Sequence, residues 1–226
     1  MTSWSEIYKS EINKKGGLLP FVLNKERRSA GALIQRMRKV FPEGARILEV
    51  GTGTGAIGAL LTKYGYVVTG IDVDEEMLKI ARESFSLFGA SDKVFCMDAE
   101  DIVEKFGKDS FDCVITHGML EHYQDEEIIS HLKKQLEVAP YAICVVPMKS
   151  MSSYYRSRGL GDERYLPTRY WRKLLSKNFN VKKVFGFGFK ETGLKYVPER
   201  IIKNNTFAKL LAPLCAFNEF WITRNR

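Results

Sequence analysis

The sequence has few of the residues that build metal clusters, disulfide frameworks or membrane spans. It has 226 residues, with four Cys and three His. The cysteines are Cys96, Cys113, Cys144 and Cys215. They show no CxxC spacing and three lie in apolar runs, which favours buried reduced thiols over disulfides and predicts no metal site. No apolar run approaches the roughly 20 residues that span a bilayer. No secretory signal is visible, so we expect a cytoplasmic protein.

Acidic residues are scarce at both ends of the chain. Residues 1–40 carry a net charge of +6 and residues 149–226 a net charge of +12, whereas residues 41–148 carry −10. Such an uneven distribution is compatible with an ordinary solvated surface. It also allows the two basic ends to approach something anionic, namely an acidic metabolite, a membrane surface or nucleic acid.

Apolar runs alternate with segments of helical periodicity, which predicts an α/β layer fold. We expect strands at 46–50, 66–72, 93–97, 111–117 and 141–146, with helices between them. The strands are rich in Val, Ile and Phe, so they should be parallel and covered on both faces. Two final strands, at 180–189 and 217–224, could form an antiparallel hairpin at the sheet edge. Asp74 is expected to cap the helix that follows it, and Thr168 another.

Three regions are expected from changes in composition along the chain. Residues 1–40 should form one or two helices, broken at Gly16-Gly17 and at Pro20, that act as a cap or lid. Residues 41–226 should form the main domain. Within it, residues 148–170 are polar, basic and aromatic, and we expect a long insertion on the substrate side.

The most informative stretch is "RILEVGTGTGAIGALLTKYGYVVTGID". A glycine-rich turn between a strand and a helix lets the backbone approach a ligand closely. "GTGAIG", from Gly53 to Gly58, fits the dinucleotide pattern GxGxxG, and Asp72 lies where a ribose-binding acid is expected. However, the pattern fails when it is counted from Gly51, the first glycine after the strand. Glu49 would also place a negative charge near a pyrophosphate.

At this point the chain resembles the class I S-adenosylmethionine-dependent methyltransferases. Their first motif, an acidic residue followed by any residue and then GxGxG, is matched by Glu49, Gly51, Gly53 and Gly55. Their later motifs are similar to Asp72, to the "CMDAE" that contains Asp98, and to "FDCVITHGMLEH". The last form is close to small-molecule enzymes of the ubiquinone-biosynthesis type. The resemblance implies a Rossmann-like three-layer sandwich whose seven-stranded, mostly parallel sheet has one antiparallel edge strand.

The resemblance also implies a cofactor site for S-adenosyl-L-methionine. Its expected members are Glu49, Gly51, Thr52, Gly53, Gly55, Asp72, Val73, Asp98, Ala99 and His117. In this assignment the glycines pass the methionine part, Asp72 binds the ribose, and Val73 packs on the adenine. Asp98 and Ala99 meet the adenine edge, although "DAED" is also typical of a helix cap. Acidic side chains suit a cofactor that carries an ammonium and a sulfonium and has no phosphate.

His117 and His122 are the candidate catalytic residues, each with a structural role as the alternative. A histidine of ordinary pKa, about 6.5, can accept a proton at neutral pH if the acceptor must lose one. His131 lies within an expected helix and is not a candidate, and Asp112 is expected to be structural. Acceptor specificity should come from outside the core. The residues assigned to it are Trp4, Tyr8, Tyr154, Tyr155, Arg156, Arg158 and Arg164.

The sequence thus predicts methyl transfer to an O, N or C atom of a small, anionic or aromatic acceptor. No [DNS]PP[YFW] tetrapeptide follows the 111–117 strand and no Pro-Cys nucleophile does either, which argues against adenine, glutamine or cytosine as acceptors. Three alternatives stay open. The basic ends permit an RNA or protein methyltransferase, the GxGxxG match permits a nicotinamide-dependent oxidoreductase, and a nucleoside-binding module without catalysis is the third.

Overall fold

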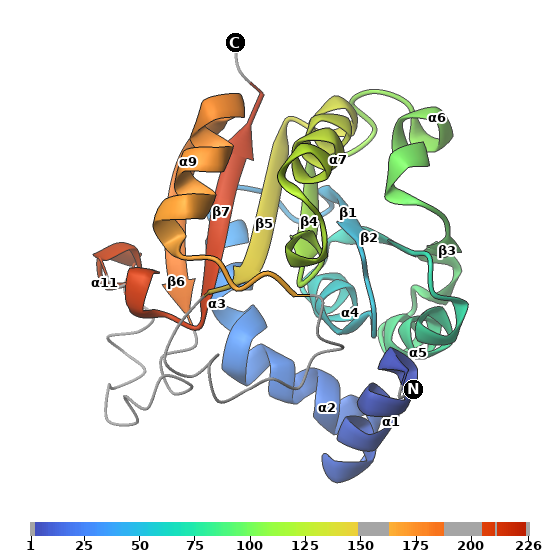
Figure 1. Cartoon of the computed structure of the whole chain (residues 1–226). Coiled ribbons are helices and arrows are strands. Elements are labelled where there is room, and N and C mark those ends of the chain that lie inside the picture. The colour runs from blue at the N-terminus through green and yellow to red at the C-terminus, as the bar shows by residue number, and fades with distance from the viewer. Residues whose placement is uncertain (1–2, 149–162, 188–204, 211, 225–226) are drawn as a thin grey trace.

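The structure is a computed structural model that describes residues 3–148, 163–187, 205–210 and 212–224. Its seven described strands form one sheet in the order β3-β2-β1-β4-β5-β7-β6 (Figure 1). They are β1 (Arg46–Val50), β2 (Val67–Asp72), β3 (Val94–Cys96), β4 (Cys113–His117), β5 (Tyr141–Pro147), β6 (Asn180–Phe187) and β7 (Phe217–Thr223). Strands β1 to β5 are parallel, and β7 is antiparallel to both of its neighbours. The mostly parallel sheet with an antiparallel hairpin at one edge is confirmed, with β6 as the outermost strand.

Helices cover both faces of the sheet and complete three layers (Figure 1). One face is covered by α2 (Leu18–Lys25), α3 (Gly31–Met37), α4 (Ala56–Lys63) and α5 (Glu75–Ser86). The other face is covered by α6 (Ile102–Phe106), α7 (Asp125–Val138) and α9 (Thr168–Asn178). Successive strand residues serve opposite cores, as when Ile47 packs on the first face and Leu48 on the second. Both faces of the central strands are therefore buried, as their composition indicates.

The N-terminal helices join the main core through α2 and α3. Helix α1 (Trp4–Lys14) is mostly exposed, whereas Phe21 and Leu33 are buried in the same cluster as β1 and β4. The break at Gly16-Gly17 is confirmed. The expected break at Pro20 is wrong, because Pro20 lies in the first turn of α2. The first turn needs no backbone N–H donor, so a proline is tolerated there.

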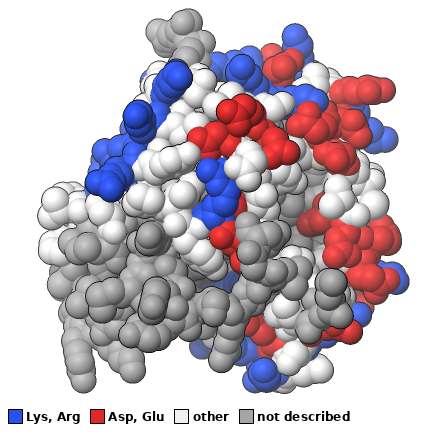
Figure 2. All heavy atoms as spheres, in the orientation of Figure 1, with Lys and Arg blue, Asp and Glu red and all other residues white. Residues whose placement is uncertain are grey.

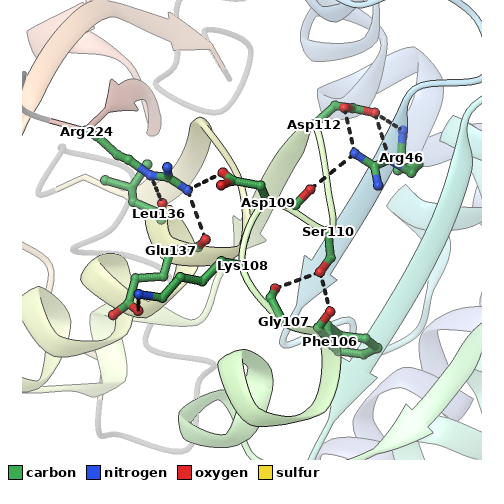
Figure 3. Close-up of polar contacts among 10 residues, drawn as sticks. All are labelled: Arg46, Phe106, Gly107, Lys108, Asp109, Ser110, Asp112, Leu136, Glu137 and Arg224. Atoms are coloured by element: carbon green, nitrogen blue, oxygen red, sulfur yellow. Dashed lines mark hydrogen bonds and ion pairs between the residues drawn. The ribbon is translucent and has the colours of Figure 1, made fainter.

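The amino ends of the strands are fixed by ion pairs far from the glycine-rich loop (Figure 3). The Asp112 carboxylate accepts hydrogen bonds from the backbone N–H of Arg46 at 2.7 Å and from its guanidinium at 3.2 Å. Arg224, beyond β7, pairs with Asp109 at 2.6 Å and donates to the Glu137 carbonyl oxygen at 2.9 Å. Asp112 therefore contacts structural partners at the amino ends of the parallel strands, whereas the candidate site lies at their carboxyl ends. This agrees with the structural role that the sequence predicts.

The sequence predicted a capping residue for each of two helices, and one of these predictions is confirmed. Asp74 caps α5, since its Oδ1 accepts from the N–H groups of Glu76 and Met77. The expected Thr168 cap is wrong, because Pro167 is the residue before α9 and the buried Thr168 hydroxyl donates to Asn218 Oδ1 at 2.6 Å. Cys113, Cys144 and Cys215 are buried free thiols. Among the described helices, none has the length and apolarity that crossing a bilayer requires.

Candidate cofactor and acceptor site

Several backbone N–H groups of the loop between β1 and α4 donate hydrogen bonds to protein oxygens. Gly51, Gly53 and Gly55 all have positive φ, which only glycine adopts without strain. The bonds are Thr52 N–H to Ile71 O at 2.9 Å, Gly53 N–H to Asp72 Oδ2 at 2.8 Å, Gly55 N–H to Thr52 O at 2.8 Å, and Gly58 N–H to Glu49 Oε2 at 3.0 Å. Four N–H groups of this loop and of the first turn of α4 are thus held by protein acceptors, two of which are carboxylates.

Glu49 lies buried beneath this loop, with 2% of its surface exposed. Its Oε2 accepts from the Thr52 hydroxyl at 2.6 Å as well as from Gly58 N–H. Burial raises the pKa of Glu49 to about 7, although both hydrogen bonds act to lower it and the charge of Asp72 adds to the rise. Glu49 therefore fixes the loop to the start of α4, and its direct contact with a cofactor stays a prediction.

Two of the glycines are required by packing between elements. A Cβ at Gly55 would lie 2.8 Å from the Ala81 Cα of α5, and a Cβ at Gly58 would lie 2.6 Å from Glu49 Oε2 and would collide with the Phe85 ring. A Cβ at Gly53, in contrast, would meet only Met77 Cε at 3.7 Å. The third glycine of the apparent GxGxxG pattern is therefore explained by the close packing of α4 on Phe85 of α5 and Glu49 of β1, without a pyrophosphate.

Asp72 and Val73 lie at the end of β2 beside the loop. Asp72 accepts from Gly53 N–H through Oδ2 and from Asp74 N–H at 3.1 Å through Oδ1. Each carboxylate oxygen can accept a further bond, so two ribose hydroxyls are within its capacity. Val73 has 65% of its surface exposed, which is unusual for a side chain of its size in this fold. This pair offers polar acceptors and an uncovered apolar surface side by side.

Asp98 and Ala99 follow β3 at the same edge of the sheet. Asp98 is exposed and caps a short 3-10 turn, accepting from Glu100 N–H at 2.8 Å, while Ala99 is buried. The helix-cap alternative is therefore realised. Burial is the largest cause that raises the pKa of Tyr123, and the negative charges of Asp98 and Asp72 are the next two. The phenol of Tyr123 thus lies within electrostatic range of both predicted cofactor-binding carboxylates.

Two residues that lie near Asp98 were not predicted from the sequence. Tyr123 carried no signal beyond being aromatic, and His131 was set aside as a helix residue. His131 is 5% exposed, with Nδ1 3.0 Å from Glu100 Oε1, and its ring packs edge-on against Tyr123 at 4.5 Å. Lys134 pairs with the second oxygen of Glu100 at 2.6 Å. Helix α7 therefore holds the loop that contains Asp98 through the contacts of His131 and Lys134 with Glu100. These contacts depend on the tertiary fold.

His117 ends β4 in a desolvated environment. Its Nε2 atom is fully buried and its ring stacks on Phe217 at 6.3 Å. Burial, followed by the positive charge of Lys25, lowers the pKa of His117 to about 4. The imidazole is therefore neutral at pH 7, but it is a much weaker base than the ordinary histidine that the sequence suggested.

The structure brings Trp4, Tyr8 and His122 together. Trp4 of α1 stacks on Tyr8 at 6.1 Å and meets the His122 ring edge-on at 6.2 Å, so helix α1 lies against the turn that follows β4. Burial raises the pKa of Tyr8 to about 12, with further contributions from Glu11, Glu121 and Glu163. This cluster is aromatic, and the charges around Tyr8 have both signs, since Lys25 Nζ lies 5.8 Å from its ring centroid.

Arg164 is occupied by contacts within the chain. Its guanidinium donates to the Tyr123 carbonyl oxygen at 2.6 Å and to Asp125 Oδ1 at 2.8 Å, and Tyr170 donates to the other oxygen of Asp125 at 2.5 Å. A contact between Arg164 and an acceptor stays a prediction. The other predicted acceptor-binding residues, Tyr154, Tyr155, Arg156 and Arg158, lie outside the described residues.

Comparison with known proteins supports this description. Residues 47–139 match the family model of a methyltransferase domain. A ubiquinone biosynthesis O-methyltransferase of Xanthomonas axonopodis is 37% identical over 89 residues, which cover 39% of this chain and 36% of that protein. The chain spans about a third of the length of the curated relatives it matches.

Two solved structures share the fold over most of the chain. Magnesium protoporphyrin IX methyltransferase from Synechocystis, with bound SAH, has a TM-score of 0.63 at 16% identity and covers 87% of this chain and 82% of its own. A SAM-dependent methyltransferase from Archaeoglobus fulgidus has a TM-score of 0.62 at 19% identity, with coverages of 90% and 99%. The described fold is that of the class I methyltransferases. The chain contains a methyltransferase domain at residues 47–139, and its described fold is shared with S-adenosylmethionine-dependent methyltransferases.

Proposed function

We propose that this chain transfers the methyl group of S-adenosylmethionine to an oxygen, nitrogen or carbon atom of a small acceptor with an aromatic part. The observation that carries the proposal is the use of loop donors. Four backbone N–H groups, those of Thr52, Gly53, Gly55 and Gly58, are bonded to protein oxygens and are not available to a pyrophosphate. The stretch from Gly51 to Gly58 also contains no Lys or Arg to neutralise phosphate. A phosphate-free cofactor with a cationic centre fits this loop better.

The residues around the loop suit an adenosyl group. Asp72 retains acceptor capacity for the ribose hydroxyls, exposed Val73 offers an apolar surface to the adenine, and Asp98 accepts at its edge. When bound, S-adenosylmethionine supplies a methyl group that its sulfonium has already activated for nucleophilic attack. The protein then has to align the acceptor and exclude water, and alignment contributes up to about 7–11 kcal/mol in well-oriented reactions.

The two histidines have different expected roles in this proposal. His117, neutral and desolvated, can accept a hydrogen bond but is a weak base at a pKa of about 4. His122 lies against Trp4, between α1 and the end of β4, which makes it the better candidate to take a proton from an acceptor. A general base contributes about 10²–10⁴-fold, and only when the acceptor must lose a proton.

The Trp4–Tyr8–His122 cluster supports an acceptor with a flat or apolar face, because aromatic rings bind such groups in stacked or edge-on geometry. The described charges near Tyr8 have both signs, because carboxylates raise its pKa and Lys25 Nζ lies 5.8 Å from its ring centroid, so these charges do not select the charge of the acceptor. The sequence-based expectation of an anionic acceptor also involves Arg156 and Arg158, which lie outside the described residues.

The proposal is tested by incubating the purified chain with S-adenosylmethionine carrying a labelled methyl group and a metabolite extract. The expected product gains one labelled methylene unit in mass. Asp72→Ala should raise the KM for the cofactor by about 10–150-fold, because hydrogen bonds to a charged group contribute about 1.5–3 kcal/mol. Asp112→Ala, at the opposite edge of the sheet, is the matched control. Absence of any labelled product, or equal kinetics for the two variants, would contradict the proposal.

A further inference from the structure

Glu100 is held by helix α7 at three of its atoms. Its backbone carbonyl oxygen accepts a hydrogen bond from Lys134 Nζ at 2.7 Å, and its Oε2 lies 2.6 Å from the same ammonium group. Its other carboxylate oxygen, Oε1, lies 3.0 Å from His131 Nδ1. The two partners are three residues apart on α7 and therefore lie on the same side of that helix. We call Glu100, His131 and Lys134 together the Glu100 clamp.

The clamp joins two elements that are themselves fixed in the core. On α7, Ile128 and Leu132 are fully buried against the sheet, and His131 is buried with its ring packed on Tyr123. On the other side of the clamp, Ala99 and Ile102 flank Glu100 and are buried in the third core cluster. The clamp therefore holds the short turn Ala99–Asp101 in one position relative to α7.

The clamped residue in turn orients Asp98. The backbone N–H of Glu100 donates to Asp98 Oδ1 at 2.8 Å. Within the described part of the chain, the other oxygen, Oδ2, accepts no hydrogen bond, and the side chain is exposed. A displacement of Glu100 would move its N–H group and with it the Asp98 carboxylate. Because a binding group has to be held within about 0.5 Å of its productive position, the clamp controls where Oδ2 points.

Neither charge nor stability distinguishes Glu100 from its neighbours. Figure 2 shows many carboxylates on the side of the molecule that carries α5 and α6. Two of them, Asp101 and Glu104, are exposed close to Glu100 in sequence. The Glu100 side chain is itself 41% exposed, and an ion pair with that much solvent contact contributes little to the stability of a fold. What Glu100 has in addition is its set of contacts on both sides, with α7 and with Asp98.

We propose that Glu100 is a positioning residue that gives the cofactor site its preference for adenine. The inference rests on the proposed function, in which Asp98 accepts a hydrogen bond at the adenine edge. The adenine amino group can donate to a carboxylate oxygen, whereas hypoxanthine has a carbonyl oxygen at that position and cannot. A site built to hydrogen-bond one polar group rejects an analogue that lacks it, provided that its own group is correctly placed. Glu100 therefore acts on base selection through Asp98, without touching the cofactor.

The test uses calorimetry to compare the binding of S-adenosylhomocysteine with that of S-inosylhomocysteine, which has hypoxanthine in place of adenine. The wild type should prefer the adenosyl compound by about 10–150-fold, and Asp98→Ala should remove this preference. Glu100→Ala and Lys134→Met should each reduce it by about 5–10-fold, through weaker binding of the adenosyl compound alone. Adding Glu100→Ala to Asp98→Ala should have no further effect on the preference. A purely structural role would weaken both compounds equally.

Lys133→Met and Glu104→Ala are the matched controls, because they remove the same charges from exposed neighbours on α7 and α6. Both should keep the wild-type preference, and thermal melting should show that every variant is folded. If Asp98→Ala loses the preference while Glu100→Ala and Lys134→Met keep it, the inference is overturned and the proposed function stands. An equal loss in the controls would also overturn the inference alone. A wild type that binds neither compound would overturn the proposed function as well.

Discussion

Glu49→Gln isolates the effect of a buried carboxyl group on stability. Burial raises the pKa of Glu49 from 4.5 in the unfolded chain to about 7 in the folded one. Below about pH 4.5 Glu49 is protonated in both the folded and the unfolded state, so its ionisation does not change the free energy of unfolding. As the pH rises toward 7 the unfolded state ionises first, and stability falls by roughly 3 kcal/mol before it levels off. This loss is expected in the wild type and not in the glutamine variant, which does not titrate.

The measurement is urea unfolding of both proteins at several pH values between about 4.5 and 8. Glutamine can accept the same bonds from Thr52 and Gly58, but its amide N–H groups also need partners. The difference in the free energy of unfolding between the wild type and Glu49→Gln therefore also contains a contribution from the amide that does not depend on pH. The informative quantity is the change in that difference with pH, which should favour the variant by roughly 3 kcal/mol more at high pH than at low pH. His117, whose lowered pKa acts in the opposite direction, is present in both proteins and cancels.

Thr52→Val is a second test of the raised pKa of Glu49. The Thr52 hydroxyl bond is one of the two contacts that lower the pKa of Glu49, so its removal should move the pH window of the loss upward. A stability difference between wild type and Glu49→Gln that stays constant across the pH range would refute the reasoning. It would mean that Glu49 ionises in the folded state as readily as in the unfolded chain.

Three further predictions concern packing, an ion pair and catalysis. Gly58→Ala should destabilise the fold by about 1–3 kcal/mol in urea unfolding, because its Cβ would overlap the Phe85 ring; unchanged stability would contradict that packing. Arg36→Met removes the bidentate partner of buried Glu219, at 2.9 and 2.5 Å, and should cost about 3–5 kcal/mol. Adding Glu219→Leu should recover most of that loss, whereas an equal loss in the double variant would show that the pair itself is stabilising. His122→Ala should lower kcat by at most about 10⁴-fold with the KM for S-adenosylmethionine unchanged; a change confined to that KM would instead place His122 at the cofactor.

The strands, the Asp74 cap and the glycine-rich loop could be predicted because their signals are local. An apolar run shows a buried strand wherever it lies, and glycines after the run show a tight turn. Thr168 and Pro20 were misjudged because a residue type that suits a cap or a break also suits a neighbouring position. Thr168 is instead bonded to Asn218, 50 residues away, which no window of sequence reveals.

The candidate site shows the same limit. Asp72 and Asp98 follow strands that end at one edge, so their approach could be expected. Glu49 was assigned to the ligand, and that contact stays a prediction. The structure adds that its Oε2 accepts from the Gly58 N–H in the first turn of α4, a contact that the sequence did not indicate. Tyr123 and His131 reach the Asp98 loop only through the packing of α7, and no spacing in the sequence indicates that.

The most direct test of the central claim is a binding measurement by calorimetry on the purified chain. S-adenosylhomocysteine and NADH are titrated separately, first into the wild type and then into Asp72→Ala. Because four N–H groups of the loop and of the first turn of α4 are bonded to protein oxygens, we expect that S-adenosylhomocysteine binds, that NADH does not, and that the substitution weakens binding by about 10–150-fold. Binding of NADH that depends on Asp72, with no binding of S-adenosylhomocysteine, would contradict it.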